Sequence, residues 1–250
     1  MRIYLSRSYV RTLEFNIGAL DAACTEGVVV GADIVVFPEL FLTAYRGQND
    51  PTRFHERFAR ISTEHTETLF IFGTISEAGH NRLNVYREGK VVAKYDKVHL
   101  FQPTGEHEMW KPGDKYVAVK FQGWTIGLMV CNDIRFPEQA RALRMKADCD
   151  IFIVPGYWPD ERDTTWATLL KARAIENGIY VVGCNVKGCD NGVENFTGAH
   201  SRVYDPGGGR LPSGRVYDLD RITRDRLLVD TDEQFVDVKK VETKDADKVK

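Results

Sequence analysis

Runs of consecutive apolar residues recur along the chain, and charged or turn-forming residues bound each of them. A continuous run of about four to eight residues rich in Ile, Val and Phe predicts a strand buried on both faces, as in a mostly parallel sheet. We therefore predict strands at residues 34–37, 69–75, 124–130, 151–154, 179–185, 201–204 and 227–232. Two shorter apolar segments on either side of residues 87–90 predict a hairpin.

Helical patterns lie between several of these strands. Residues 13–24 and 50–68 place apolar side chains at helical spacing, and Pro137 opens a third helix at its first position. Residues 164–177 form the clearest helix, with Gly178 as its C-cap. Helices that alternate with buried strands predict an α/β domain in which the helices cover the sheets.

The domain organisation follows from the even distribution of this pattern. No linker divides the chain, so we predict a single domain over residues 1–238. Residues 239–250 are dominated by charged side chains, which predicts a mobile C-terminal tail.

Composition narrows the functional classes. The chain has 250 residues, 43% of them hydrophobic, and a formal net charge of −2, so it offers no electrostatic case for binding nucleic acid or an anionic membrane. Its apolar runs are too short to span a bilayer, and residues 1–8 contain no apolar signal-peptide region. Five cysteines without paired spacing predict reduced thiols and a cytoplasmic protein. Cys184 and Cys189 lack a nearby histidine or third cysteine, so we expect no metal.

Cys131 is the first candidate for chemistry. It lies between the end of a predicted buried strand and the helix that begins at Pro137. Backbone N–H groups and the positive end of a helix dipole lower the pKa of a thiol, so this position predicts a thiolate nucleophile. The alternative is a buried, inert cysteine, which is the commoner fate of this residue type.

Two further ionisable residues also lie close to predicted strands. Glu39 follows the strand at residues 34–37, and Lys97 stands among apolar residues. Residues 32–39 and residues 148–157 share an order of acidic residue, apolar run and proline. This repeated pattern predicts two similar halves whose strand ends converge on one site. The alternative is that the similarity is a coincidence.

Three segments, taken together, resemble the nitrilase superfamily of carbon–nitrogen hydrolases. They are residues 37–40, 95–101 and 130–138. Residues 105–108, 158–159, 166–177 and 183–185 are similar to the bacterial ω-amidase branch, whose members hydrolyse 2-oxoglutaramate-type ω-amides. The resemblance implies a four-layer α-β-β-α sandwich and a homodimer or higher homo-oligomer. It also implies a small-molecule amide substrate and no metal or organic cofactor.

The resemblance assigns a role to each central residue. Cys131 is the covalent nucleophile, which forms a thioester and releases ammonia. Glu39 is the general acid and base. The Lys97 ammonium and the backbone N–H of Asn132 stabilise the oxyanion. Glu106 is the second glutamate, which supports Lys97.

Other residues receive less definite roles. Glu108 is the alternative to Glu106 as second glutamate, and Tyr157 and Trp158 are expected to line the substrate pocket. Arg135 and Arg173 are candidates to meet a substrate carboxylate, although a salt bridge is the better expectation for Arg173.

The chain departs from the family pattern near the site, which leaves alternatives open. Asn132 and Asp133 replace the Trp-Glu pair of nitrilases, which favours an amide over a nitrile. Asn132 stands where ω-amidases usually have tyrosine, and residues 41–45 also differ from the usual pattern. The alternatives are an aliphatic amidase, an N-carbamoyl amino acid amidohydrolase or a nitrilase of the same superfamily. Outside these enzymes they are a non-catalytic binding member of the fold and a metal-binding protein.

Overall fold

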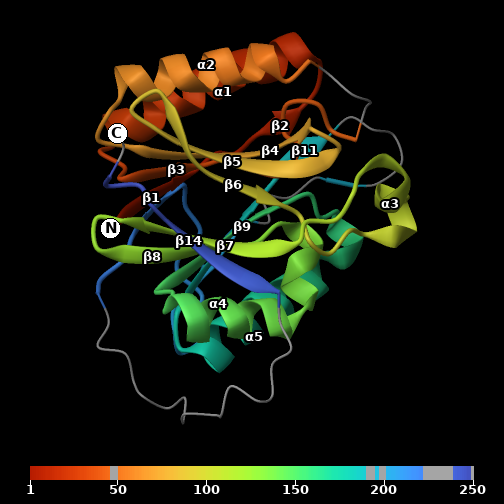
Figure 1. Ribbon diagram of the computed structural model, residues 1–250, viewed down its shortest axis with the longest axis vertical. Coiled ribbons are helices and arrows are strands. Elements are labelled where there is room, and N and C mark those ends of the chain that lie inside the picture. Colours follow the sequence, from red (N-terminus) through yellow and green to blue (C-terminus); the bar gives the residue numbers. More distant parts are fainter. Residues whose placement is uncertain (46–49, 190–194, 197–200, 222–238, 249–250) are drawn as a thin grey trace.

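Two six-stranded sheets pack face to face, and each is covered on its outer side by a pair of helices (Figure 1). The computed structural model describes residues 1–45, 50–189, 195–196, 201–221 and 239–248. The predicted four-layer α-β-β-α sandwich is confirmed. The strand predicted at residues 227–232 lies outside the described residues.

The first sheet contains parallel strands followed by a hairpin. In spatial order its strands are β13 (Val216–Asp218), β1 (Arg2–Leu5), β3 (Ile34–Val36), β4 (Leu69–Glu77), β5 (His80–Arg87) and β6 (Lys90–Asp96). β1, β3 and β4 are mutually parallel, whereas β5 and β6 form the hairpin predicted around residues 87–90. Helices α1 (Leu13–Val29) and α2 (Thr52–Glu64) cover the outer face.

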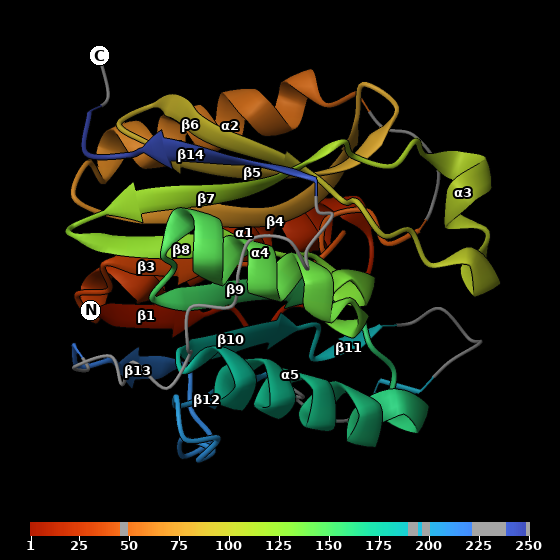
Figure 2. The same cartoon turned by 60° about the horizontal axis from the view of Figure 1, so that its bottom comes forward.

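The second sheet has a closely similar order. Its strands are β12 (Arg202–Tyr204), β10 (Tyr180–Asn185), β9 (Ile151–Gly156), β8 (Trp124–Leu128), β7 (Lys115–Phe121) and β14 (Lys240–Asp245). Helices α4 (Pro137–Ala147) and α5 (Asp163–Asn177) lie on the side opposite α1 and α2 (Figure 2). Shorter elements complete the fold: the strand pair β2 (Tyr9–Val10) and β11 (Gly188–Cys189), the 3₁₀ turns η1 (Gln102–Thr104), η2 (Cys131–Arg135) and η3 (Asp160–Arg162), and helix α3 (Glu106–Met109).

The central strands of the two sheets are arranged in the same way. β3 and β9 occupy the third position of their sheets, each between two parallel neighbours. These are the strands of the two segments with the shared order of acidic residue, apolar run and proline. The predicted pair of similar halves is therefore present.

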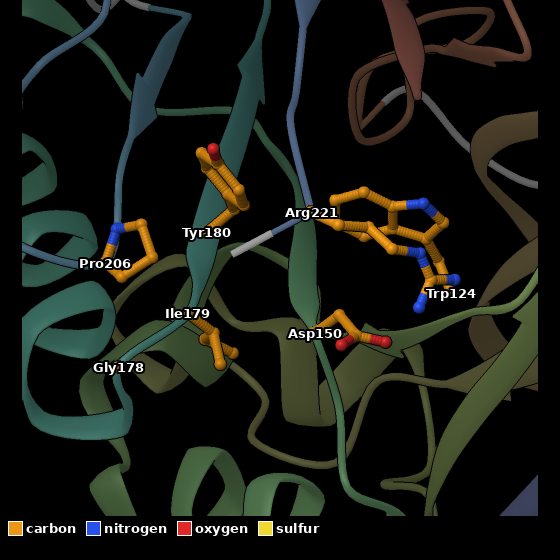
Figure 3. A pocket seen from close by; sticks show the side chains of 7 residues that line it. All are labelled: Trp124, Asp150, Gly178, Ile179, Tyr180, Pro206 and Arg221. Carbon is orange, nitrogen blue, oxygen red and sulfur yellow. The ribbon is translucent and has the colours of Figure 1, made fainter. Parts of the chain in front are cut away.

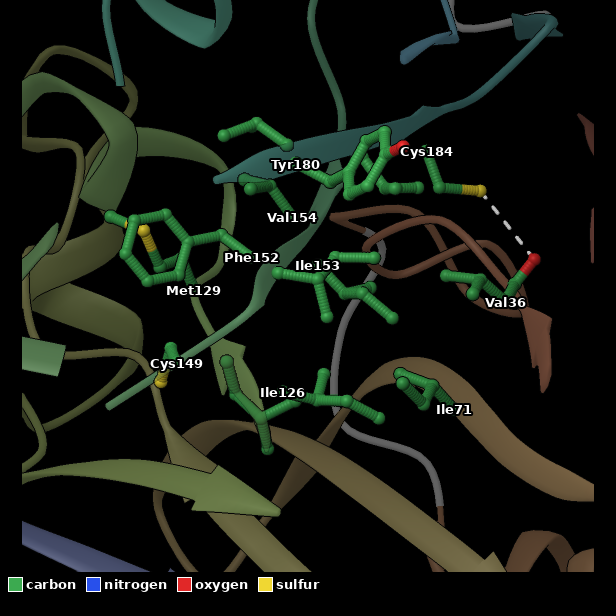
Figure 4. Close-up of a cluster of buried hydrophobic side chains, with 14 of the residues drawn as sticks. Val36, Ile71, Ile126, Met129, Cys149, Phe152, Ile153, Val154, Tyr180 and Cys184 are labelled. Carbon is green, nitrogen blue, oxygen red and sulfur yellow. Dashed lines mark hydrogen bonds between the residues drawn. The ribbon is translucent and has the colours of Figure 1, made fainter. Parts of the chain in front are cut away.

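The continuous apolar runs are explained by burial on both faces of each strand. In β3, Ile34 and Val36 belong to the core between the sheets, whereas Val35 packs in the cluster beneath α1 and α2. Figure 4 shows Val36 facing Cys184 of β10, whose sulfur lies 3.5 Å from the Val36 carbonyl oxygen. Cys184 is thus part of the dry core between the sheets.

The helix boundaries follow local rules that the sequence already carries. Thr12 caps α1 by accepting a hydrogen bond from the Phe15 N–H at 3.3 Å. Pro137 is the first residue of α4, and α5 ends where Gly178 adopts a left-handed φ of 60°. The predicted helix start at Pro137 and the predicted C-cap at Gly178 are confirmed. No helix in the described part of the chain is long and apolar enough to cross a membrane.

The predicted mobile tail is wrong for its described part. Residues 240–245 form β14, which pairs in parallel register with β7 at the edge of the second sheet. Lys115 of β7 lies 2.5 Å from Glu242, and the Ala246 N–H donates to the Lys120 carbonyl at 2.8 Å. Charged side chains are common on edge strands, because there they face water while the backbone pairs.

Candidate active site

Glu39 is carried just beyond the end of β3 and is fully buried. The neighbouring strand β4 fixes this segment, because the Leu40 N–H donates to the Thr74 hydroxyl at 3.0 Å. Gly73 has a φ of +57°, and a Cβ there would lie 1.9 Å from the Pro38 carbonyl oxygen. Only glycine lets the β4 backbone pass this close to the Glu39 segment.

Lys97 follows β6 and is also fully buried. Its ammonium donates to Oε1 of Glu39 at 2.8 Å and to Oε1 of Glu106 at 2.7 Å. Its own backbone is held by Asn81 and Gly113, at 3.0 and 2.9 Å. An ammonium has three N–H groups, so one remains for a further acceptor.

Cys131 is buried and begins η2, three positions after β8 of the second sheet ends at Leu128. Its φ of +49° is unusual for a residue other than glycine and marks a tight, strained turn. The backbone N–H of the next residue, Asn132, donates to no group in the described chain. The turn therefore presents a thiol with an adjacent unused N–H donor, as the oxyanion role of Asn132 requires.

Asp133 ties the Cys131 turn to the segment after Lys97. Its carboxylate accepts hydrogen bonds from the Val130 N–H at 2.8 Å and from the Tyr95 hydroxyl at 2.7 Å. The other oxygen meets the backbone N–H and the Nδ1 of His99 at 2.9 and 2.8 Å. The His99 ring also stacks on Phe136 with centroids 3.7 Å apart. His99 is thus a structural residue that helps to fix the nucleophile.

We predict that Asp133→Asn lowers both stability and turnover. The amide presents N–H groups where the carboxylate accepted, so at least one buried donor loses its partner, which costs about 1–3 kcal/mol. Urea unfolding measures the stability and steady-state kinetics the turnover. Asp150→Asn is the matched control, since Asp150 accepts the Thr125 N–H at 2.7 Å before β9. Destabilisation without loss of kcat in Asp133→Asn would contradict the positioning of Cys131 by this residue.

The surroundings of Cys131 change the expected pKa of its thiol. Burial and the negative charge of Glu39 hold the pKa of the Cys131 thiol well above its usual value, although Lys97 opposes them. The predicted lowering of this pKa by a helix dipole is therefore wrong. Helix α4 begins at Pro137, six positions after Cys131, so the thiol is not at that helix terminus. A thiol in this setting needs a base at the moment of reaction.

Glu39 is placed to be that base. Burial raises the pKa of Glu39, as does the charge of Glu106, and Lys97 only partly offsets them. Oε1 is occupied by Lys97 and by the Asn81 side chain at 2.9 Å, whereas Oε2 is buried and has no hydrogen bond of ordinary geometry in the described chain. The thiol of Cys131 interacts with this carboxylate. One Glu39 oxygen is thus anchored, and the other is available for a proton.

Glu106 and Glu108, the two candidates for the second glutamate, differ clearly in burial. Glu106 is fully buried against Lys97, and its Oε2 accepts the Phe101 N–H at 2.8 Å. The Glu108 side chain is 77% exposed. Burial alone would lower the pKa of Lys97, but the charges of Glu39, Cys131 and Glu106 outweigh it and raise that pKa. Lys97 therefore stays an ammonium and is no base.

Tyr157 and Trp158 are both buried and follow β9. Tyr157 meets the ring of Tyr45 edge-on, with centroids 5.4 Å apart. The guanidinium of Arg135 lies over the Trp158 ring at 4.7 Å, and a negative charge on Cys131 raises the pKa of Arg135. Both aromatic residues therefore lie close to residues around the site.

The two arginine candidates differ in their partners. Arg173 is buried, donates to the Ile134 carbonyl at 3.0 Å and pairs with Glu176 at 3.1 Å, so it serves the structure. Arg135 forms no ion pair with any described residue. Burial lowers the pKa of Arg135. A half-buried arginine of this kind suits an anionic ligand.

Three residues at the site were missed from the sequence: Tyr45, Asn81 and Asp133. Tyr45 donates to Glu106 at 2.9 Å, and Asn81 donates to Glu39. Asp133 holds the Cys131 turn. Tyr45 lies in the loop after Glu39, where an aromatic residue so close to a strand-end carboxylate is a usable signal. Asn81 has no such local signal, because it reaches Glu39 across the sheet from β5.

A separate hollow lies away from this chemistry. It is lined by Trp124, Asp150, Gly178, Ile179, Tyr180, Pro206 and Arg221 (Figure 3). Five of these residues, all except Pro206 and Arg221, lie at the beginnings of β8, β9 and β10, whereas Cys131 and Tyr157 follow the ends of β8 and β9. The hollow thus opens at the opposite edge of the sheet. No group of His, Cys, Asp and Glu in the described residues has the arrangement of a metal site.

Comparison with known proteins agrees with this geometry. Residues 5–215 match the carbon-nitrogen hydrolase family. The omega-amidase YafV of Escherichia coli (strain K12) is 33% identical over 202 residues, which are 78% of this chain and 77% of that protein. The 2-oxoglutaramate amidase of Bacillus subtilis (strain 168) is 31% identical over 196 residues, or 73% of this chain and 74% of that protein.

Solved structures share the fold. The amidase NitN from Nesterenkonia sp. AN1 gives a TM-score of 0.76 at 27% identity, covering 88% of this chain and 93% of that chain. XC1258 from Xanthomonas campestris, a CN-hydrolase superfamily protein with an arsenic adduct in its active site, gives a TM-score of 0.74 at 27% identity. It covers 87% of this chain and 88% of that chain. The chain therefore belongs to the carbon-nitrogen hydrolase family of the nitrilase superfamily, and it is similar to omega-amidases within that family.

Proposed function

We propose that this protein hydrolyses the C–N bond of a small carboxylic amide through a thioester on Cys131. The observation that carries the proposal is the buried ammonium of Lys97, held between Glu39 and Glu106 next to the Cys131 thiol. A relative supports the nucleophile: in a variant of the Nesterenkonia sp. AN1 amidase, acrylamide has added to the active-site cysteine.

Acylation begins when Glu39 takes the thiol proton and the sulfur attacks the amide carbon. The negative charge moves to the carbonyl oxygen, where the third N–H of Lys97 and the N–H of Asn132 receive it. One such donor accounts for roughly 10²–10³ in rate. Glu39 then returns the proton to the amide nitrogen, the C–N bond breaks, and ammonia leaves while the thioester forms on Cys131.

Deacylation uses the same groups in reverse. Glu39 takes a proton from water, whose oxygen attacks the thioester carbon. Lys97 and Asn132 again stabilise the oxyanion. The C–S bond breaks, the thiolate recovers the proton from Glu39, and the carboxylic acid leaves. Glu39 acts as base and acid in turn, for which a raised pKa suits it. The cycle consumes one water and needs no oxidant or reductant.

The substrate class follows from Arg135. Arg135 has no ion-pair partner among the described residues and is held over Trp158, so it offers a planar fork to a carboxylate. We therefore propose an ω-amide that carries a free carboxylate, of the 2-oxoglutaramate or succinamate type, with Tyr157 and Trp158 lining its pocket. The omega-amidase and 2-oxoglutaramate amidase names of the relatives support this choice. An uncharged aliphatic amide, an N-carbamoyl amino acid and a nitrile are the alternatives.

A substrate panel tests this choice. Ammonia release is measured with 2-oxoglutaramate, succinamate, propionamide, an N-carbamoyl amino acid and a nitrile. We expect the highest kcat/KM for one of the two carboxylate-bearing amides. Preference for propionamide, the N-carbamoyl compound or the nitrile would replace the proposed substrate class with that alternative.

We predict that Arg135→Gln selectively impairs the carboxylate-bearing substrate. Loss of a charged hydrogen bond of about 1.5–3 kcal/mol lowers kcat/KM for succinamate by roughly 10- to 100-fold. The kcat/KM for propionamide changes little, because that amide has no carboxylate. Arg60→Gln on α2, where the side chain is 52% exposed, is the control and leaves both values unchanged. Equal losses for both substrates would contradict a carboxylate-binding role.

We also propose a homodimer in the cytoplasm. Met145 of α4 and Ile175 of α5 are large apolar side chains left exposed on the outer helices, which supports an interface there. None of the five cysteines is in a disulfide, which is consistent with a reducing compartment.

A further inference from the structure

Tyr45 contacts the charged centre directly, although the proposed mechanism does not use it. Its hydroxyl donates to Oε1 of Glu106 at 2.9 Å, and the same oxygen accepts from Lys97 at 2.7 Å. The other Glu106 oxygen accepts the Phe101 N–H at 2.8 Å. Glu106 is thus fixed by three donors, and Tyr45 is the only one of them that belongs to the segment after Glu39.

The backbone that carries Tyr45 is strained and firmly held. Leu40 and Ala44 have φ values of 45° and 51°, which residues with a side chain seldom adopt. The Ala44 N–H closes the turn onto the Leu40 carbonyl at 2.7 Å, and the Asn16 side chain of α1 donates to the Leu42 carbonyl at 2.8 Å. Such strain persists where the surroundings fix the conformation, and it is common at functional sites.

The Tyr45 ring connects the charged centre to the proposed pocket. It meets Tyr157 edge-on with centroids 5.4 Å apart and Trp110 at 5.9 Å with the planes at 57°. Burial and the charges of Glu39 and Glu106 hold the pKa of Tyr45 well above its usual value. The hydroxyl therefore remains a donor at neutral pH.

We propose that Tyr45 is a positioning residue for amide hydrolysis, which fixes Glu106 so that Lys97 stays between the two carboxylates with its third N–H directed at the substrate oxygen. This inference rests on the proposed roles of Lys97 and Glu106. Without the hydroxyl, one Glu106 oxygen loses a donor and the carboxylate gains freedom to follow the ammonium. The oxyanion then meets a less well-placed donor, which slows the chemical steps more than it weakens binding.

Tyr45→Phe is the direct test, because phenylalanine keeps the ring contacts and removes only the hydroxyl. We expect kcat for succinamate to fall roughly 10- to 100-fold, as for loss of a hydrogen bond to a charged group, while KM changes by less than about threefold. Tyr86→Phe is the matched control, since the Tyr86 hydroxyl bonds His55 away from the site. It should leave kcat unchanged, and the two variants should have similar melting temperatures.

The outcomes separate this inference from the proposed function. A kcat within twofold of wild type in Tyr45→Phe, while Cys131→Ala and Glu106→Gln are inactive, overturns the role of Tyr45 alone. A rise in KM at unchanged kcat also overturns it, because Tyr45 would then bind substrate. A melting temperature far below that of Tyr86→Phe overturns it in favour of a structural role. Near-normal turnover by Cys131→Ala would instead overturn the proposed function.

Discussion

Cys131→Ala is expected to reduce amide hydrolysis to the background rate and to leave the protein folded. The substitution removes the sulfur that forms the proposed acyl-enzyme. No other group in the described site is a comparable nucleophile, because Lys97 stays protonated and Glu39 is the proposed base. The fold should survive because alanine is small and Asp133 holds the turn independently of the sulfur. Ammonia release and circular dichroism measure the two effects.

A matched cysteine distinguishes loss of the nucleophile from loss of a buried thiol. Cys24 of α1 is buried, and burial raises its pKa well above the usual value, as it does for Cys131. Cys24→Ala should therefore cost some stability and leave kcat within about twofold of wild type, since large-to-small core changes act on packing. If Cys131→Ala kept a similar kcat, a thiol-dependent reaction at this residue would be ruled out.

Lys97→Met is expected to lose both activity and stability. The variant loses the donor to the oxyanion, which accounts for roughly 10²–10³ in rate. It also leaves Glu39 and Glu106 buried without their shared cation, and breaking a buried ion pair from one side costs about 3–5 kcal/mol. Lys94→Met is the control on the adjoining strand β6, because Lys94 is 41% exposed where it pairs with Glu77. Its effects on stability and on kcat should be small.

The stability loss in Lys97→Met should depend on pH. Lys97 lowers the pKa of Glu39, which burial and Glu106 raise, so removal of the ammonium lets this pKa rise further. A carboxyl whose pKa is higher in the folded chain than in the unfolded chain binds a proton on folding, so stability falls as the pH rises through that interval. The variant should be less destabilised at about pH 5 than at about pH 8. If the loss of stability did not depend on pH, the claim that Glu39 and Glu106 are a buried, charged pair would be contradicted.

Sequence reasoning identified what is local in this molecule. A run such as residues 34–37 indicates a strand with two buried faces, and Pro137 and Gly178 mark helix ends through their own backbone preferences. The order of acidic residue, apolar run and proline correctly indicated two halves. The resemblance of three short segments indicated Glu39, Lys97 and Cys131. In the fold, Lys97 bonds Glu39, and Cys131 lies close to Glu39.

What sequence reasoning missed depends on groups that are far apart in the chain. The pKa of Cys131 is set by burial and by Glu39, which no local pattern reveals. Asn81 reaches Glu39 across the sheet, and Tyr45 reaches Glu106 from a strained turn. Strand β14 is stabilised by backbone pairing with β7, so its charged side chains gave no sign of order.

The central claim is that a thioester forms on Cys131. The direct measurement is the mass of the enzyme after acid quenching during turnover of a slow amide, followed by peptide mapping. We expect one added acyl group, located on the peptide that contains Cys131 and absent from Cys131→Ala. An acyl group located on Cys184 or Cys189 would contradict the claim, as would turnover by Cys131→Ala at a near-normal rate.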